Sequence, residues 1–416
     1  MKIRSVRITP VAVPDVPLLN LKGVHQEVFL RSIIEVTCDS GRVGISESHG
    51  ATRTLDSLNR AAESLVGLDI FDLNGLRHRI NEALPDAGGI NVPTALADPR
   101  LVDVVYGAFE VACLDLQGQH LDRPVCDLLG GAVRRHVPYG GYLFYKFAKP
   151  AGQPGEDLFG EVMTPEALVA EARAMVAEHG FGSLKLKGGV LEPELEVETL
   201  LKLREAFPNA PLRIDPMGAW SVDTAIRLSR KLKGVLEYLK DPTPGLDGMA
   251  AVARFSPLPL ATNLVVVAFE QVIEALRKDA VAIVLSDHHD WQGMTGALHL
   301  ARMCRAGGLG VSMHSNAHLG ISLAAMTHTA AAMPNLTHDC DTHYPWVQDE
   351  VIKGGKLRFD KGRLAVPTGP GLGVEIDQEA LARLHALYNS VGLRARDDTD
   401  EIRKYIPDFE CRVPRW

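Results

Sequence analysis

Short apolar runs alternate with helical stretches from Val137 onward, and this alternation constrains the fold more than any other feature. After the second run the spacing is roughly 25 residues, which is typical of repeated βα units. About eight such units can close into a parallel barrel. The runs lie at 139–145, 183–187, 212–215, 235–240, 258–263, 281–285, 309–313 and 335–340. The sequence therefore predicts an α/β fold built on a closed parallel barrel.

The segment before the barrel has a different pattern. Strands are indicated near Ile3–Arg7 and Phe29–Thr37, and helical periodicity follows through 54–66 and 102–120. A chain of 416 residues also exceeds the usual limit for one core. We expect an N-terminal α+β domain over 1–135, completed by a C-terminal segment over 370–416, and a barrel over 136–369.

Composition narrows the possible partners. The net charge is -8 without a basic run, which argues against nucleic acid. No apolar run is long enough to cross a bilayer, and the first ten residues lack the apolar centre of a secretion signal. We expect a cytoplasmic protein that acts on a small molecule. A closed symmetric homo-oligomer is the default expectation for such a chain.

Two lysines stand out in the second apolar run. Lys185 and Lys187 are two residues apart on a predicted buried strand, so their side chains point the same way. Crowding two ammonium groups lowers the pKa of at least one of them, which makes a neutral lysine available as a base near pH 7. A solvated pair on an edge strand is the alternative.

Polar residues follow several of the other predicted strands, where a barrel carries its chemistry. Asp215 and Asn263 end two of the runs, and their oxygens suit a hard cation such as Mg²⁺. A helix cap and a turn are the plain alternatives for these two residues. Together with the lysine pair, they favour a metal site.

A histidine and a carboxylate end two neighbouring strands. His314 lies one strand after Asp287, and a carboxylate that orients an imidazole makes a general acid/base. Four further histidines have no comparable pairing in the sequence, and we interpret them as structural or as supporting the residues that contact substrate: His288, His289, His318 and His338.

With these residues in order along the chain, the sequence resembles the enolase superfamily, and within it the glucarate dehydratases. The resemblance covers nearly the whole chain, and the specific feature is the Lys-x-Lys motif followed by the ordered Asp, Asn, Asp and His. The matching segments are 17–25, 141–144, 184–190, 214–216, 218–220, 261–263, 314–316, 341–343 and 371–377. The resemblance implies a modified TIM-type (β/α)7β barrel with an N-terminal α+β capping domain.

The resemblance also implies an activity and a set of roles. A Mg²⁺-dependent dehydratase removes the proton next to a carboxylate of an acid sugar such as D-glucarate and then expels the neighbouring hydroxyl. Lys187 and His314 would be the two bases, with Asp287 steering His314 and Lys185 polarising the carboxylate. The metal would use Asp215 and Asn263. Substrate contacts would come from Asn20, His25, Thr94, Tyr142, Ser315, Asn316 and His343.

The chain departs from this pattern around the metal. Where the family has a glutamate ligand, this sequence has Lys240, whose ammonium cannot ligate Mg²⁺. Met217 stands where an asparagine is usual. Asp241 follows Lys240 and points to the other strand face unless the backbone bends there.

Three accounts of Lys240 follow. Its ammonium takes the metal's place beside Asp215; a metal binds weakly through Asp215, Asn263, Asp241 and water; or a modification turns Lys240 into an acidic ligand. Three functional hypotheses stay open. The protein is an acid-sugar dehydratase; it is a non-catalytic relative in which Lys240 replaces the metal; or it is a racemase, epimerase or other lyase acting on another acid.

Overall fold

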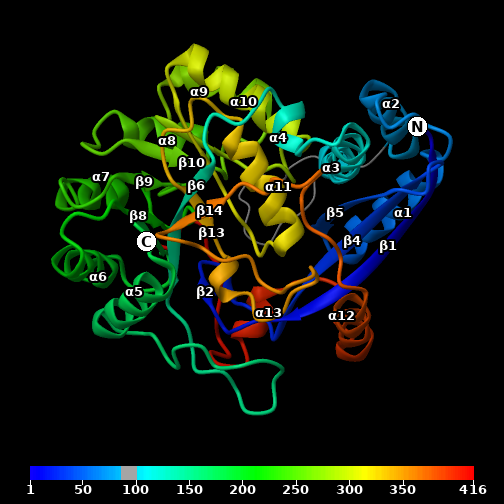
Figure 1. Cartoon of the computed structure of the whole chain (residues 1–416). Coiled ribbons are helices and arrows are strands. Elements are labelled where there is room, and N and C mark those ends of the chain that lie inside the picture. The colour runs from blue at the N-terminus through cyan, green and yellow to red at the C-terminus, as the bar shows by residue number, and fades with distance from the viewer. Residues whose placement is uncertain (86–100) are drawn as a thin grey trace.

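The computed structural model describes residues 1–85 and 101–416, and its centre is a curled parallel sheet (Figure 1). The sheet runs in the order β12-β11-β10-β9-β8-β7-β6-β13, with β14 paired antiparallel to β6. The strands are β6 His136–Phe144, β7 Leu184–Lys187, β8 Leu212–Asp215, β9 Tyr238–Lys240, β10 Leu260–Thr262, β11 Ile283–Ser286, β12 Gly310–Met313, β13 Cys340–Thr342 and β14 Arg363–Ala365.

The two ends of this sheet meet at β12 and β13. The backbone N–H of Thr337 donates to the carbonyl of Val311 at 3.0 Å, and Ser312 Oγ donates to the carbonyl of Asp339 at 2.9 Å. These bonds join the edges without a regular ladder, so the sheet curls round into the barrel that the spacing predicts.

Helices follow the strands and cover the outside of the barrel. They are α5 Pro165–His179, α6 Pro193–Ala206, α7 Val222–Lys231, α8 Leu246–Ala253, α9 Phe269–Lys278, α10 Gly293–Gly307 and α11 Gly320–Ala331. Local sequence sets their ends: in α5, Thr164 caps the first turn by accepting from Ala167 N, and Gly180 ends the helix with a φ of 71°.

A second layer lies beside the barrel in Figure 1. Its antiparallel sheet, β1-β4-β5, is called the cap sheet below. The elements of this region are β1 Ile3–Pro14, β2 Leu19–Asn20, β3 Gly23–Val24, β4 Val28–Cys38, β5 Val43–His49, α1 Thr52–Ser64, α2 Leu73–Ala83, α3 Leu101–Leu121 and α4 Val125–Leu128. Apolar residues of the cap sheet and of α1, α2 and α3 form their own buried cluster.

After η1 Tyr344–Trp346 and β14, the chain forms α12 Gln378–Val391 and α13 Asp398–Ile402. Helix α12 contacts β1, and α13 contacts β3. Helix α12 packs along β1, where His385 Nδ1 lies 2.7 Å from the carbonyl oxygen of Pro10. Helix α12 and strand β1, which are far apart in the sequence, therefore lie side by side next to the barrel.

One predicted strand is wrong in position. Residues 335–339 lie in a loop, and β13 begins only at Cys340, which pairs with Tyr139. The loop uses Thr337 and Asp339 to bind the edge of β12, so these residues cannot extend β13. Within the described ranges, no helix has the length and apolarity needed to cross a membrane.

Candidate active site

The paired lysines of β7 both point into the barrel. Lys187 stands beside Asp215 in the ladder of β7 with β8, and its Nζ donates to Asp215 Oδ2 at 3.1 Å. Lys185 donates to Asp341, and its Nζ lies 3.7 Å from the centre of the Tyr142 ring. Both lysines are buried, which excludes the solvated edge pair.

The pKa values of both lysines are lowered, as the sequence predicts, but for another reason. Burial is the main cause, and it lowers the pKa of Lys185 to about 7. The repelling charge is Lys240 rather than the lysine two residues away. Asp215 acts in the opposite direction on both, so burial prevails over an attractive neighbour.

Asp215 accepts hydrogen bonds from two buried ammonium groups at this end of the barrel. Its Oδ2 accepts from Lys187, from Lys240 Nζ at 2.7 Å and from the Tyr142 hydroxyl at 3.4 Å. Its Oδ1 accepts from the backbone N–H of Met217 at 3.1 Å. The pKa of Asp215 is lowered because Lys187 and Lys240 outweigh its burial, so this residue stays an anion.

Lys240 is fully buried between two carboxylates. Besides its bond to Asp215, its Nζ lies 3.3 Å from Asp241 Oδ2. Strand alternation would turn Asp241 away, but its φ of 41° bends the chain and brings the carboxylate inward. Asp241 is then held by the backbone N–H of Asn263 at 3.1 Å and by the Thr262 hydroxyl.

Asn263 follows β10 and differs from its neighbours. Its side-chain oxygen Oδ1 is buried and has no hydrogen-bond partner among the described residues. A buried amide oxygen without a partner is costly, so this atom is a candidate acceptor for a ligand.

The loop after β7 is fixed by one buried carboxylate. Glu196 of α6 accepts from the backbone N–H groups of Gly189, Val190 and Leu191, at 3.1, 2.9 and 3.1 Å. This brace holds the chain that leaves Lys187. Burial raises the pKa of Glu196 to about 7.

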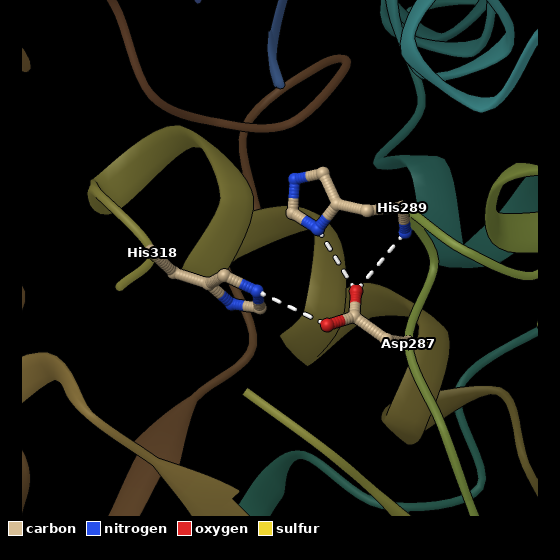
Figure 2. A group of neighbouring side chains, drawn as sticks. All are labelled: Asp287, His289 and His318. Carbon is tan, nitrogen blue, oxygen red and sulfur yellow. Dashed lines mark hydrogen bonds and ion pairs between the residues drawn. The ribbon is translucent and has the colours of Figure 1, made fainter. Parts of the chain in front are cut away.

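The histidine side of the barrel mouth is more crowded than the sequence predicts. His314 Nδ1 lies 3.4 Å from Asp287 Oδ2, in the predicted pairing. His289 is closer: its Nδ1 lies 2.8 Å from Asp287 Oδ1, and its backbone N–H donates to the same oxygen at 3.0 Å (Figure 2). His318 Nε2 lies 3.6 Å from Asp287 Oδ2.

The expectation that His289 and His318 have no comparable pairing is therefore wrong. Four imidazoles lie around one carboxylate, because the loops after β11 and β12 fold over the same buried point. The fourth is His288, whose Nδ1 is 3.8 Å from Asp287 Oδ1. His338 keeps away from this cluster and packs edge-on against Tyr238 at 5.5 Å. The pKa of His314 is lowered, mainly by burial, so its neutral form prevails.

One pocket collects most of the predicted residues. Its lining includes both predicted bases and six predicted substrate contacts: Lys187, His314, Asn20, His25, Tyr142, Ser315, Asn316 and His343. Lys185, Asp215, Asn263 and Asp287 are not among the lining residues. Thr94 lies outside the described residues. The bases thus reach the pocket from β7 and from the end of β12, two separate sides of the barrel.

One charged residue of this pocket was not predicted from the sequence. Arg396, from the C-terminal segment, lines it and donates from Nε and Nη2 to Asp398 at 2.5 and 2.6 Å. Asn20 donates to the same carboxylate at 2.7 Å. No spacing or motif marks Arg396, because only the return of the chain end brings it to the barrel.

Two histidines complete the rim. His25 Nδ1 lies 3.0 Å from Asp15 Oδ2, and its ring stacks on His343 with centres 5.9 Å apart. The far side of the pocket thus combines Asn20 and His25 of the N-terminal segment and Arg396 of the C-terminal segment with His343, which follows β13.

The fold and the site together define a parallel-barrel protein with acid–base groups from two sides of its mouth. The family model described as "Enolase C-terminal domain-like" matches residues 167–380. The chain belongs to the enolase superfamily.

Relatives match over the full length. A probable glucarate dehydratase from Streptomyces coelicolor is 47% identical, over 100% of this chain and 99% of the relative. An enolase from Thermobispora bispora, crystallised with magnesium and formate, is 50% identical with a TM-score of 0.97, covering 100% of both chains. An enolase from Pseudomonas fluorescens, with bound magnesium, potassium and tartrate, is 46% identical with a TM-score of 0.96, covering 100% of this chain and 99% of the other.

Proposed function

We propose that the protein is a hydro-lyase that dehydrates an acid sugar, an aldarate such as D-glucarate. The observation that carries the proposal is the pocket that Lys187 and His314 line from two sides of the barrel. The similarity to a probable glucarate dehydratase supports the same reaction class.

The reaction divides between the two bases. In the first step, neutral Lys187 or neutral His314 takes the proton from the carbon next to a carboxylate, and the electrons move into that carboxylate. Because His314 Nδ1 faces Asp287, its Nε2 is the atom that handles protons in the pocket. In the second step, His314 gives a proton from Nε2 to the departing hydroxyl, and water and an enol remain. This is the abstracted proton where His314 was the base; where Lys187 was the base, His314 must first take a proton from solvent. The enol then takes a proton at carbon to give the keto acid.

Fixed cations would stabilise the charge that develops on the carboxylate. Lys240 lies buried behind the pocket, where few waters compete with it, and its pKa is raised by Asp215 and Asp241 against the effect of burial. Lys185, whose pKa is lowered to about 7, adds positive charge when it is protonated. On the rim, Arg396, Asn20 and His25 offer donors for hydroxyls and for the second carboxylate of an aldarate.

The residues do not fit Mg²⁺ as they stand. Asp215, Asp241 and the unpartnered oxygen of Asn263 are suitable ligands. The charged Lys240, however, donates to Asp215 Oδ2 at 2.7 Å and faces Asp241. A divalent cation at these oxygens would meet a buried ammonium at close range without solvent. We therefore propose that Lys240 supplies positive charge at this point, and no step above passes through a metal.

A second candidate function follows from the same contact. An ammonium carries one charge and cannot bind an oxygen as a Lewis acid. The bond from Lys240 to Asp215 thus favours, as the alternative, a protein that binds aldarates without turning them over. Bases on two sides would equally serve a racemase or epimerase, which would return the epimer in place of a keto acid.

We further propose the organisation expected from the sequence: a cap over 1–135 and 370–416, a barrel over 136–369, a cytoplasmic location and a symmetric homo-oligomer. Size measurement by light scattering tests the last point.

Product analysis tests the function. D-glucarate and a panel of other aldarates would be incubated with the protein and with the Lys187→Ala and His314→Asn variants, and keto acid would be measured. The proposal expects keto acid from the wild type and a loss of about 100-fold or more in His314→Asn, which lacks the acid of the second step. Lys187→Ala should show the same loss only for aldarates whose reacting proton faces Lys187. Lys146→Ala is a matched control, because Lys146 is also buried but pairs with Asp157. Keto acid from no aldarate would refute dehydration, and binding without product would select the second candidate.

A further inference from the structure

An arginine of the cap sheet reaches the histidine cluster of the barrel. Arg31, on β4, is 2% exposed, and its Nε donates to Glu47 Oε1 of β5 at 2.6 Å. Its Nη2 lies 3.0 Å from Nε2 of His289. The cap sheet therefore contacts the group that binds Asp287, although Arg31 does not line the pocket.

Glu47 fixes the arginine in this position. Its two oxygens accept from the backbone N–H groups of Leu319 and Ser322 at the start of α11, each at 3.0 Å. The carboxylate is thus bound to the barrel at the same time as to Arg31. A guanidinium held by its Nε has little freedom to turn away, so its contact with His289 is defined by both layers.

The contacts with Arg31 and with Asp287 favour the same position for the proton of His289. A guanidinium only donates, so Nε2 of His289 must present a lone pair to Arg31. The neutral ring then carries its proton on Nδ1, which lies 2.8 Å from Asp287 Oδ1. The Ser322 hydroxyl, 2.9 Å from Nε2, can donate to the same lone pair.

We propose that Arg31 is a positioning residue for the base His314, acting through His289 and Asp287. Arg31 selects the tautomer in which His289 donates to one oxygen of Asp287. Asp287 thereby stays ionised, and its other oxygen, Oδ2, can accept from His314 Nδ1. The effect on catalysis rests on the proposed function, whereas the tautomer of His289 does not.

Loss of Arg31 would free His289 Nε2 to take a proton. The ring could then donate to Ser322 through Nε2 and turn a lone pair toward Asp287, or become an imidazolium that neutralises Asp287. In both states Asp287 orients His314 less well. Lys187 lies on β7, and no hydrogen bond or ion pair joins it to Arg31, His289 or Asp287 among the described residues. Proton removal by Lys187 should therefore be unchanged.

Two measurements test the proposal. The first is the ring-nitrogen NMR spectrum of His289 in ¹⁵N-histidine-labelled protein, identified by its absence in His289→Gln. The expected result is a protonated Nδ1 and a bare Nε2 in the wild type, and a changed pattern in Arg31→Met. Arg7→Met is the matched control, because Arg7 also pairs with a cap-sheet glutamate, Glu35, at 2.6 Å but touches no barrel histidine.

The second measurement is deuterium exchange into two aldarates that are epimeric at the reacting carbon. Arg31→Met should slow exchange roughly tenfold or more for the epimer whose proton faces His314, and leave the Lys187 epimer within about twofold. Equal slowing of both epimers, or of neither, would overturn the proposal, as would a wild-type His289 protonated on Nε2.

The two arms separate the two claims. If no aldarate exchanges with any variant, the proposed function fails, and the NMR result alone decides on the tautomer. If Arg31→Met does not fold, the exchange experiment is repeated with Arg31→Lys. The wild-type spectrum by itself can still refute the tautomer.

Discussion

Replacing Lys240 by glutamate should convert the end of β9 into a metal site. In the wild type, Lys240 Nζ lies 2.7 Å from Asp215 Oδ2 and 3.3 Å from Asp241 Oδ2 in a fully buried position. Lys240→Glu removes this cation and adds a carboxylate beside two others. Breaking a buried pair costs about 3–5 kcal/mol, and the like charges add to that cost. Without metal, the variant should therefore unfold several kcal/mol more easily.

Mg²⁺ should offset a large part of this loss. Binding to the folded state alone stabilises it by about 2.7 kcal/mol when the free metal is 100 times its Kd. The free energy of unfolding, measured by chemical denaturation with and without Mg²⁺, should rise in Lys240→Glu and stay constant in the wild type. Lys240→Met is the control, because it removes the charge without supplying a ligand and should gain nothing from the metal.

Two results would refute this reasoning. One is a wild type that Mg²⁺ stabilises as much as the variant, with the effect lost in Asp215→Asn. The other is a Lys240→Glu protein that folds but shows no heat of Mg²⁺ binding in calorimetry.

Three further predictions follow from the site. Lys187→Ala and His314→Asn should each abolish deuterium exchange for one of two epimeric aldarates and spare the other, as followed by proton NMR. Arg396→Lys should weaken aldarate binding about tenfold in calorimetry, because a lysine cannot keep two bonds to Asp398 and still face the pocket. Glu196 has its pKa raised by burial to about 7, so its protonated form favours the folded state. That contribution to stability is fully present below the unfolded pKa of 4.5 and is lost as the pH rises through 7. Between pH 5 and 8, the free energy of unfolding of the wild type should fall by up to about 3 kcal/mol relative to that of Glu196→Gln, as measured by chemical denaturation.

Barrel strands could be predicted from the sequence where each run is short, apolar and closed by a polar residue. The run at 212–215 coincides with β8, and 183–187 contains all of β7. The eighth run failed because polar residues that tie a loop to β12 look like the start of a strand. Strand β5, Val43–His49, was not predicted, since Ser46, Glu47 and Ser48 interrupt its apolar pattern although all three are buried.

Residue types at strand ends singled out Lys187 and His314, and both line one pocket because parallel strands bring their carboxyl ends to one mouth. The other predicted lining residues came from the family resemblance, and their roles stay predictions. Contacts between distant segments could not be predicted in this way. Arg396 reaches the pocket from the last tenth of the chain, and Arg31 reaches His289 across 258 positions. Asp241 needed a left-handed backbone to turn inward, and no sequence period encodes that bend.

The histidines around Asp287 keep this carboxylate ionised, and Asp287 in turn orients His314. A carboxylate shared by His314, His289 and His318 is kept ionised, and its pKa is held well below the usual range, chiefly by His289 against the effect of burial. The sequence pattern predicts only the pair of His314 and Asp287. It does not predict the shared carboxylate, since His289 and His318 lie in two different loops.

The most direct test of the central claim is exchange of the proton next to the carboxylate of D-glucarate in deuterated water, followed by proton NMR with excess EDTA and again with Mg²⁺. The account predicts exchange by the wild type at the same rate in both solutions, and its loss when Lys187→Ala and His314→Asn are combined. Exchange that requires Mg²⁺ would contradict the role given to Lys240, and the absence of exchange in both solutions would contradict the dehydratase itself.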